Sequence, residues 1–137
     1  MAFEVKRRVE FRDTDAAGIV HFSAFFPIME VAEHELLRSV GISVLSHKVD
    51  DGPPISWPRV SAKCDYLAPA RFEDQLLIAV SVSKIGKTSV RYRFEINNES
   101  GPVATGEVTA VCCRFTEQGL QKVEIPASIR KLLVQFQ

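Results

Sequence analysis

Long apolar runs are missing from this chain of 137 residues, and no stretch approaches the length that is needed to cross a bilayer. A net charge is missing too, since 17 Lys and Arg residues balance 17 Asp and Glu residues. No overall positive field is therefore available to gather nucleic acid or anionic lipid. We expect a protein with no nucleic-acid or membrane partner, in which an anionic ligand is met by a local group of cations.

Cysteine is scarce, and its spacing does not suit metal or redox chemistry. The chain has Cys64, Cys112 and Cys113 but no Cys-x-x-Cys pair, and its histidines have no second ligand at metal-binding spacing. The first residues, MAFEVKRRVEF, contain no apolar signal core. We expect a reducing, cytoplasmic location, with neither a metal nor a cofactor.

What the chain does contain is typical of one globular domain. Hydrophobic residues make up 46% of it and charged residues 25%, and the length is enough to bury a core without disulfides. There is no linker, repeat or low-complexity stretch. We therefore expect a single domain over residues 1–137.

The stretch from Asp13 to Gly41 joins an acidic turn to an apolar helix. The turn DTDAAG holds two carboxylates and Gly18, which allows backbone angles that a side chain would forbid. From Phe22 the apolar residues recur at intervals of three and four, the spacing that keeps one helix face apolar. These residues are Phe22, Phe25, Phe26, Met29, Ala32, Leu36 and Val40.

The ends of this helix carry their own signals. Ser23 is the expected N-cap, Pro27 falls close to the start, and Gly41 stands where a helix often ends in a left-handed residue. The acidic turn thus runs into the positive end of a helix dipole, where backbone N–H groups have no internal partners. Such a place can hold an anion or polarise a carbonyl.

The remainder of the chain reads mainly as strands. Apolar and polar residues alternate in a first strand, Phe3 to Phe11, and in four later ones separated by turn residues. These are Val60 to Leu67, Gln75 to Ile85, Ser89 to Asn97 and Val103 to Phe115. A last helical segment follows Pro126.

This order of elements predicts an α+β fold in which a five-stranded antiparallel sheet wraps around one long central helix. Such a sheet has edges to protect, and an exposed edge commonly pairs with a second copy of the chain. We expect a dimer or a higher oligomer.

Asp15 is the first candidate for a catalytic group. A carboxylate beside a helix N-terminus can activate water or attack a carbonyl, while the amides polarise the carbonyl oxygen. The alternative is that Asp13 and Asp15 only accept hydrogen bonds from turn amides, which is the commoner role of Asp in a loop. His21 can be a base, a substrate contact or a polar residue at the end of the loop.

Two glutamates on the helix are further candidates. Glu33 lies near the apolar stripe, where an unpaired charge is costly, so we expect it to pair with Lys or Arg across an interface. Glu30 lies at the edge of the stripe and can reach a pocket. A cluster of cations around one turn, Lys84, Lys87, Arg91 and Arg93, suits the phosphates of coenzyme A or is a solvated hairpin.

Three segments together resemble the hotdog-fold acyl-CoA thioesterases of the 4-hydroxybenzoyl-CoA thioesterase family. The first is VEFRDTDAAGIVHF from Val9 to Phe22, followed by Glu30 and by Leu36-Leu37-Arg38. The others are CDYLAPARF from Cys64 to Phe72, and ATGE from Ala104 to Glu107. The resemblance covers nearly the entire chain, and its Asp-x-Asp-x-x-Gly-x-Val core is fairly specific.

The resemblance implies an acyl-CoA substrate and a hydrolytic site between two subunits of a homodimer, which pairs into a homotetramer. It assigns Asp15 as nucleophile or general base on the thioester carbonyl, and the Phe22 N–H as the group that binds the carbonyl oxygen. Gly18 and His21 complete the expected catalytic segment. Phe25, Phe26 and Glu30 are the expected acyl contacts, with Lys84, Lys87 and Arg91 for coenzyme A.

The chain departs from two branches of this family. The branch linked to the Tol–Pal envelope system has Tyr at the position of Phe11 and Tyr-His after the turn, whereas this chain has His21 and Phe22 there. The aromatic-acyl branch has Trp and Tyr at those two positions and an acidic residue at the position of Glu30. These departures leave the acyl group open, aromatic or aliphatic.

Two other functions remain open from the sequence. His21-Phe22 and Pro27 echo the His-Phe-Pro stretch of hotdog dehydratases and hydratases of acyl thioesters, although that function would leave Asp15 idle. The third hypothesis is an acyl-CoA-binding module without catalysis.

Overall fold

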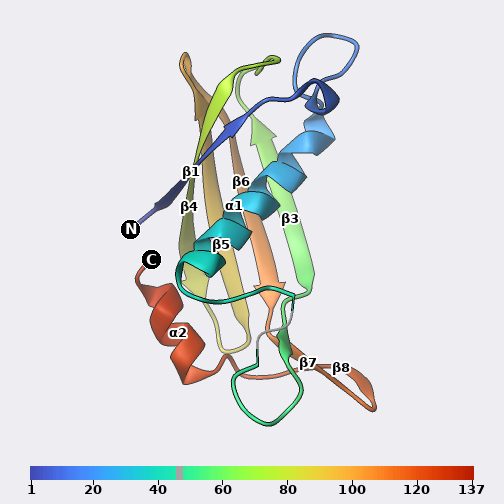
Figure 1. Ribbon diagram of the computed structural model, residues 1–137, viewed down its shortest axis with the longest axis vertical. Coiled ribbons are helices and arrows are strands. Elements are labelled where there is room, and N and C mark those ends of the chain that lie inside the picture. Colours follow the sequence, from blue (N-terminus) through green and yellow to red (C-terminus); the bar gives the residue numbers. More distant parts are fainter. Residues whose placement is uncertain (46–47) are drawn as a thin grey trace.

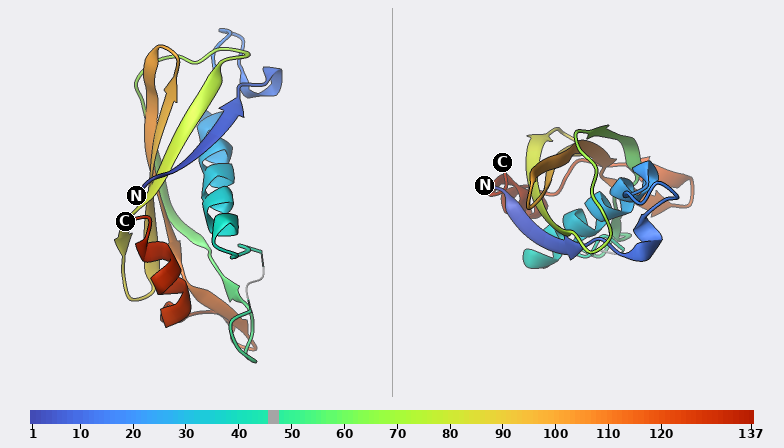
Figure 2. Two further views of the ribbon diagram at one scale, coloured as in Figure 1. Left: turned by 60° about the vertical axis from the view of Figure 1, so that its left-hand side comes forward. Right: turned by 90° about the horizontal axis from the view of Figure 1, so that it is seen from above.

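The computed structural model describes residues 1–45 and 48–137, and its centre is the helix α1 (Phe25–Ser39). A five-stranded antiparallel sheet in the order β1-β4-β5-β6-β3 lies against this helix (Figure 1). Its strands are β1 (Phe3–Arg8), β3 (Arg59–Tyr66), β4 (Gln75–Ile85), β5 (Ser89–Asn98) and β6 (Gly101–Val111). Seen from above in Figure 2, the sheet curves around α1, which confirms the predicted α+β hotdog fold.

The core lies between α1 and the concave face of the sheet. Phe25, Ile28, Met29, Ala32 and Leu36 of the helix are buried against alternating residues of β4 and β5. On β6, a Cβ added to Gly106 would overlap the Met29 sulfur, so a larger residue there would force the Met29 side chain to move.

Smaller elements lie at the lower end of the sheet in Figure 1. The short strands β2 (Ile55–Ser56), β7 (Cys113–Thr116) and β8 (Gly119–Lys122) form a second sheet at the lower end in Figure 1. The helix α2 (Ala127–Val134) begins directly after Pro126, as predicted. None of the described helices has the length and apolarity that a membrane span requires.

Two predicted strands are shorter than the sequence indicated. The first ends at Arg8, and Phe11–Asp13 forms a turn of 3-10 helix, η1, because the Asp13 carboxylate accepts from the Glu10 N–H at 2.8 Å. The predicted strand Val103 to Phe115 divides at Cys112 into β6 and β7. The Cys112 N–H bonds to the Thr88 carbonyl instead of continuing either ladder.

The helix start also differs from the prediction, because Ser23 is not the N-cap. A turn of 3-10 helix, η2 (Phe22–Ala24), precedes α1, and its cap is His21, whose Nδ1 accepts from the Ser23 N–H at 3.2 Å. The predicted end is confirmed, since Gly41 has φ +82° just beyond the last turn.

Candidate active site

Asp15 sits in a turn that its own side chain helps to hold. Its Oδ1 accepts from the Ala17 N–H at 2.9 Å, and its carbonyl accepts from the Gly18 N–H at 3.0 Å. Gly18 adopts φ +80°, the left-handed conformation expected of it. In the described part of the chain, no donor bonds to Oδ2, so one oxygen of Asp15 is left for a ligand.

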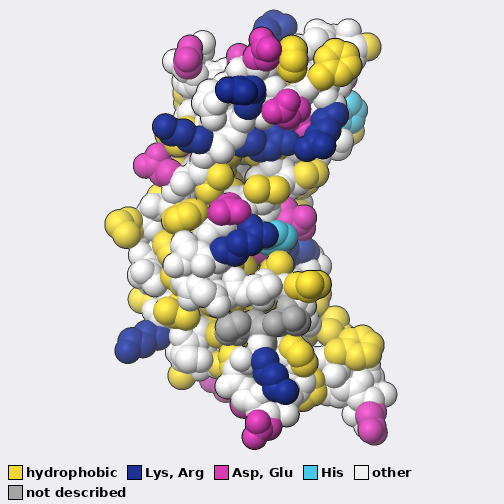
Figure 3. Space-filling view, in the orientation of Figure 1, with side chains coloured by type: hydrophobic (Ala, Val, Ile, Leu, Met, Phe, Trp, Pro, Cys, Tyr) yellow, Lys and Arg dark blue, Asp and Glu magenta, His cyan; other side chains and the backbone are white. Residues whose placement is uncertain are grey.

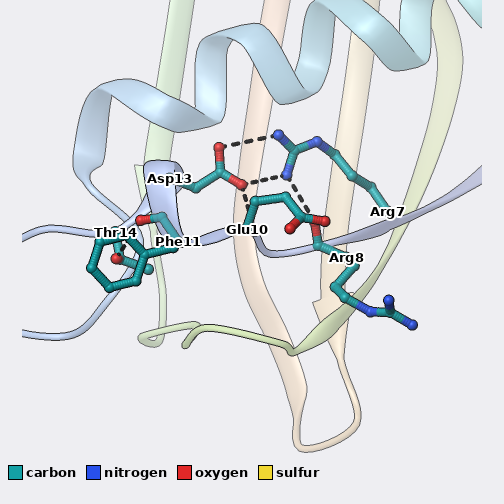
Figure 4. Close-up of polar contacts among 6 residues, drawn as sticks. All are labelled: Arg7, Arg8, Glu10, Phe11, Asp13 and Thr14. Atoms are coloured by element: carbon teal, nitrogen blue, oxygen red, sulfur yellow. Dashed lines mark hydrogen bonds and ion pairs between the residues drawn. The ribbon is translucent and has the colours of Figure 1, made fainter.

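Asp13 occupies a different environment although it is only two residues away. Arg7 donates to both of its oxygens, at 2.7 and 3.1 Å, and the Glu10 N–H donates a third bond (Figure 4). The hydrogen bond from Arg7 is the main reason why the pKa of Asp13 lies below its ordinary value. The Asp13 carboxylate therefore binds the loop to Arg7 of β1, and Asp15 is the carboxylate that has an oxygen free to contact a ligand.

A groove of about 470 Å³ opens beside Asp15, between the start of α1 and the end of β3. Phe22, Phe25, Tyr66, Leu67 and the segment from Ala68 to Ala70 form much of its wall, which is mostly apolar. The Tyr66 hydroxyl donates to the Phe22 carbonyl at 2.9 Å and so ties β3 to the helix start.

The Phe22 N–H is the free donor at this helix start. The neighbouring amides are occupied, since the His21 N–H bonds to the Asp13 carbonyl and the Ala24 N–H to the His21 carbonyl. For Phe22, no acceptor is found among the residues that the structure describes. Phe22 and Asp15 thus line one groove with a free N–H and a free carboxylate oxygen between them.

His21 lies at the junction of the loop and the helix. Its Nδ1 is within 2.8 Å of the Ser23 hydroxyl as well as accepting from the Ser23 N–H, and its ring packs against that of Phe22 at 4.5 Å. No hydrogen bond joins His21 to Asp15 in the described structure. The contacts of His21 therefore fix the backbone around Phe22.

Phe26 and Glu30 do not line the Asp15 groove. They lie further along α1 at a second hollow of about 100 Å³, which they share with Glu33, Arg59, Ala62 and Val108. The expected acyl contacts are thus divided, with Phe25 in the groove and the other two in this second hollow.

The predicted pairing of Glu33 with a cation across an interface is wrong, because its partner belongs to the same chain. Its Oε1 accepts from the Arg59 guanidinium of the same chain at 2.6 Å. Burial raises the pKa of Glu33 to about 7, since desolvation of the carboxylate outweighs the attraction of Arg59. Arg59 also donates to the Trp57 carbonyl at 2.6 Å.

The cations Lys84, Lys87 and Arg91 lie around the β4–β5 turn, at the opposite end of the sheet from Asp15 (Figure 1). The strand β4 is 11 residues long, so its two ends lie about 33 Å apart at the usual rise of a strand. Within one chain the structure does not bring these cations to the Asp15 groove. Figure 3 shows charges of both signs mixed over the visible face rather than gathered in one patch.

Metal ligands are not gathered at the groove. In residues 1–45 and 48–137, no three His, Cys, Asp and Glu side chains are grouped so as to hold a metal ion.

A comparison with protein-family models matches residues 9–133 to the thioesterase-like superfamily. The chain belongs to this family. The match spans the acidic loop, α1 and the strands β3 to β6 of the main sheet, and it leaves out β1 (Phe3–Arg8). It includes every residue that lines the Asp15 groove.

Known relatives agree with this assignment. The chain is 32% identical over 129 residues to a 1,4-dihydroxy-2-naphthoyl-CoA hydrolase of Nostoc punctiforme, covering 94% of this chain and 84% of the relative. It resembles the crystal structure of a 1,4-dihydroxy-2-naphthoyl-CoA thioesterase from Synechocystis, with a TM-score of 0.85, 25% identity and coverage of 98% and 96%. A gentisyl-coenzyme A thioesterase has a TM-score of 0.80 and 30% identity, with coverage of 93% and 99%.

These findings confirm the expected reaction class, a thioester hydrolase. The structure adds residues that the sequence did not single out for the site. Tyr66 and the segment from Leu67 to Ala70 form one wall of the groove, and Arg59 belongs to the second hollow. The sequence did contain evidence for the groove wall from Tyr66 to Ala70, because these residues belong to CDYLAPARF, one of the three segments that carried the family resemblance.

Proposed function

We propose that the chain hydrolyses an acyl-CoA thioester in the Asp15 groove. The observation that carries this proposal is the pair of free groups there, the Asp15 Oδ2 and the Phe22 N–H. The Phe22 N–H, at the positive end of η2 and α1, donates to the thioester carbonyl oxygen and stabilises the negative charge that develops on it.

Asp15 acts on the carbonyl carbon in one of two ways. As a general base it takes a proton from water, which adds to the carbon before the C–S bond breaks and coenzyme A leaves as the thiolate. As a nucleophile it displaces coenzyme A itself, and water then cleaves the acyl–Asp15 anhydride. A single turnover in ¹⁸O-labelled water detects the nucleophilic route when water attacks the Asp15 carbonyl of the anhydride, because the label then enters the Asp15 side chain. General-base hydrolysis puts the label in the product acid alone.

The acyl group is proposed to be a hydroxylated aromatic acid. The relatives named for 1,4-dihydroxy-2-naphthoyl and gentisyl esters cover most of this chain, and both names describe hydroxylated aromatic rings. The groove walls include Phe22, Phe25 and Tyr66, which suit a flat apolar ring.

The active unit is proposed to be a homodimer formed through β3. This strand lies at the edge of the main sheet and pairs only with β6 among the described strands. Three large apolar side chains on or just beyond this strand are exposed: Val60 by 63%, Tyr66 by 48% and Leu67 by 57%. Edge strands of monomers usually avoid this much exposed apolar surface. The homotetramer and the role of Lys84, Lys87 and Arg91 in holding coenzyme A stay predictions.

Thiol release tests the proposed reaction. Benzoyl-CoA, 4-hydroxybenzoyl-CoA, phenylacetyl-CoA and short and long aliphatic acyl-CoA esters are compared for the native protein, Asp15→Asn and Asp51→Asn. The last variant is a matched control, because Asp51 is exposed and its neighbour Asp50 bonds to Arg114 of β7, which lies at the lower end in Figure 1. We expect Asp15→Asn to lose about 10²- to 10⁴-fold in kcat, the usual range for a general base, and Asp51→Asn to match the native protein. Retention of turnover in Asp15→Asn would falsify the assignment.

A further inference from the structure

The hollow between α1 and β3 contains a buried carboxyl group that the proposed reaction does not use. Glu33 is 1% exposed, and although its Oε1 is bound to Arg59, its Oε2 has no partner among the described residues. A buried oxygen without a partner is costly, and native structures rarely leave one without a reason. Glu33 lines the hollow, but Oε2 itself has less than 1 Å² of accessible surface, so a group that enters the hollow reaches it only by displacing a neighbouring side chain.

The other walls define what fits. Phe26, Ala62 and Val108 are apolar, and the carboxyl groups of Glu30 and Glu33 and the Arg59 guanidinium are the polar groups. The volume of about 100 Å³ admits one small ring or a few waters and no phosphate-bearing group of coenzyme A. Two carboxyls also repel an anion. The chemistry of the site therefore selects a neutral apolar group that carries a hydroxyl.

The thioester that delivers this group cannot lie in the groove of the same chain. Phe22 and Glu33 are eleven residues apart, about 16 Å along a helix, which is longer than one acyl ring. In the proposed dimer the two β3 strands run antiparallel, so the Tyr66 end of one lies beside the Arg59 end of the other. The groove of one subunit then adjoins the second hollow of its partner.

We propose that Glu33 is a specificity-determining residue that binds a hydroxyl group on the acyl ring of a thioester seated in the partner subunit's groove. The inference rests on the proposed function for the identity of the ester. The hydroxyl donates to Oε2 of Glu33, while Arg59 holds Oε1 and thereby orients the carboxyl group. The pKa of Glu33, raised to about 7 by burial, suits this role, because its carboxyl can accept or donate a hydrogen bond near neutral pH.

Binding to a catalytically silent protein tests the inference apart from turnover. In the Asp15→Asn background, dissociation constants are measured by equilibrium dialysis for 4-hydroxybenzoyl-CoA and benzoyl-CoA, which differ by one hydroxyl. We expect the hydroxylated ester to bind about tenfold or more tightly, the effect of one hydrogen bond to an ionisable group. Adding Glu33→Gln should bring the ratio of the two constants towards one.

Further variants make the result specific. Glu35→Gln, at a half-buried residue of the same helix that does not line the hollow, is the matched control and should keep the ratio. Ala62→Leu narrows the hollow while leaving Glu33 and Arg59 themselves unchanged, and should lower the ratio even if Glu33→Gln folds poorly. The dimer dissociation constant of each variant is measured by sedimentation.

The outcomes separate the two proposals. An unchanged ratio in Glu33→Gln and Ala62→Leu overturns the inference, as does a ratio that responds only to Glu30→Gln. A change in dimer dissociation with no change in the ratio also overturns it, since the partner's own side chains then fill the hollow. If the ratio responds as expected but native protein hydrolyses no ester, the hydroxyl site stands and the proposed function fails.

Discussion

Asp13 and Asp15 carry the same side chain two residues apart, and their environments give them opposite roles. Asp13 accepts two bonds from Arg7 and one from the Glu10 N–H, whereas Asp15 keeps an oxygen free. The sequence alone left both carboxylates as possible turn residues. The distinguishing signal was Arg7, which interrupts the apolar alternation of the first strand because its side chain reaches Asp13.

Asp13→Asn is expected to lower stability rather than to abolish chemistry. The amide keeps one acceptor oxygen but loses the charge-assisted pair with Arg7, so unfolding should become easier by about 1–3 kcal/mol. Because the pKa of Asp13 is lowered in the folded state, this contribution is present above the unfolded pKa and disappears as the pH falls through the folded one. Urea unfolding at pH 7 and pH 3 measures it, and equal differences at both pH values would contradict it.

For Glu33 we expect stability to depend on pH with the opposite sign, so that it falls as the pH rises. Its pKa rises from 4.5 in the unfolded chain to about 7 in the fold, so its favourable contribution is complete below pH 4.5 and is lost as the pH rises to about 7. At 1.36 kcal/mol per pKa unit, the loss is at most about 3 kcal/mol. Arg59, which attracts the charged form, and Glu30, which opposes it, both act on this carboxyl.

The measurement is the free energy of unfolding at pH 5, 6, 7 and 8, for the native protein and Glu33→Gln at one protein concentration. As the pH rises, the free energy of unfolding of the native protein should fall relative to that of Glu33→Gln. His34, whose pKa burial lowers, destabilises the fold at the acid end in both proteins and so cancels. Parallel curves would show that Glu33 titrates alike in the folded and unfolded states.

Among the elements, the helix start depends on a residue that helix propensities do not single out. Ser23 has the preferred chemistry for an N-cap, but the observed cap is His21, two residues earlier, and its Nδ1 accepts from the Ser23 N–H. The helix itself, its apolar stripe and its end at Gly41 were predictable from spacing. The break between β6 and β7 was not, because it depends on a tertiary bond from Cys112 to Thr88.

His21 is expected to act as a positioning residue for the Phe22 N–H. His21→Ala should cost about 1 kcal/mol of stability, the usual value of a cap, and should also lower kcat because the free N–H is displaced. His21→Asn should restore both, since Asn caps well. Thiol release and urea unfolding are compared for the two variants. A stable but inactive Asn variant would instead show that the imidazole takes part in the chemistry.

For the whole molecule, one chain explains only part of the proposed site. The fold was predictable because a single apolar helix and five alternating strands have few ways to bury their faces together. The division of the acyl contacts between two hollows was not, since Phe25 and Phe26 are adjacent in the sequence and differ only in the direction in which the helix turns them. Antiparallel pairing of β3 would reunite the two hollows, one from each subunit.

Val60→Lys tests this arrangement at the edge of the sheet. A charge on β3 opposes pairing with a second copy, so the variant should sediment as a monomer at concentrations where the native protein is a dimer. The matched control is Val134→Lys on α2, where the valine is 50% exposed and Val60 is 63% exposed. This variant should remain dimeric. If both subunits complete each site, kcat/KM of Val60→Lys should rise with protein concentration in step with the dimer fraction. Full turnover by a monomer would mean that one chain's groove suffices, and that the second hollow serves another purpose.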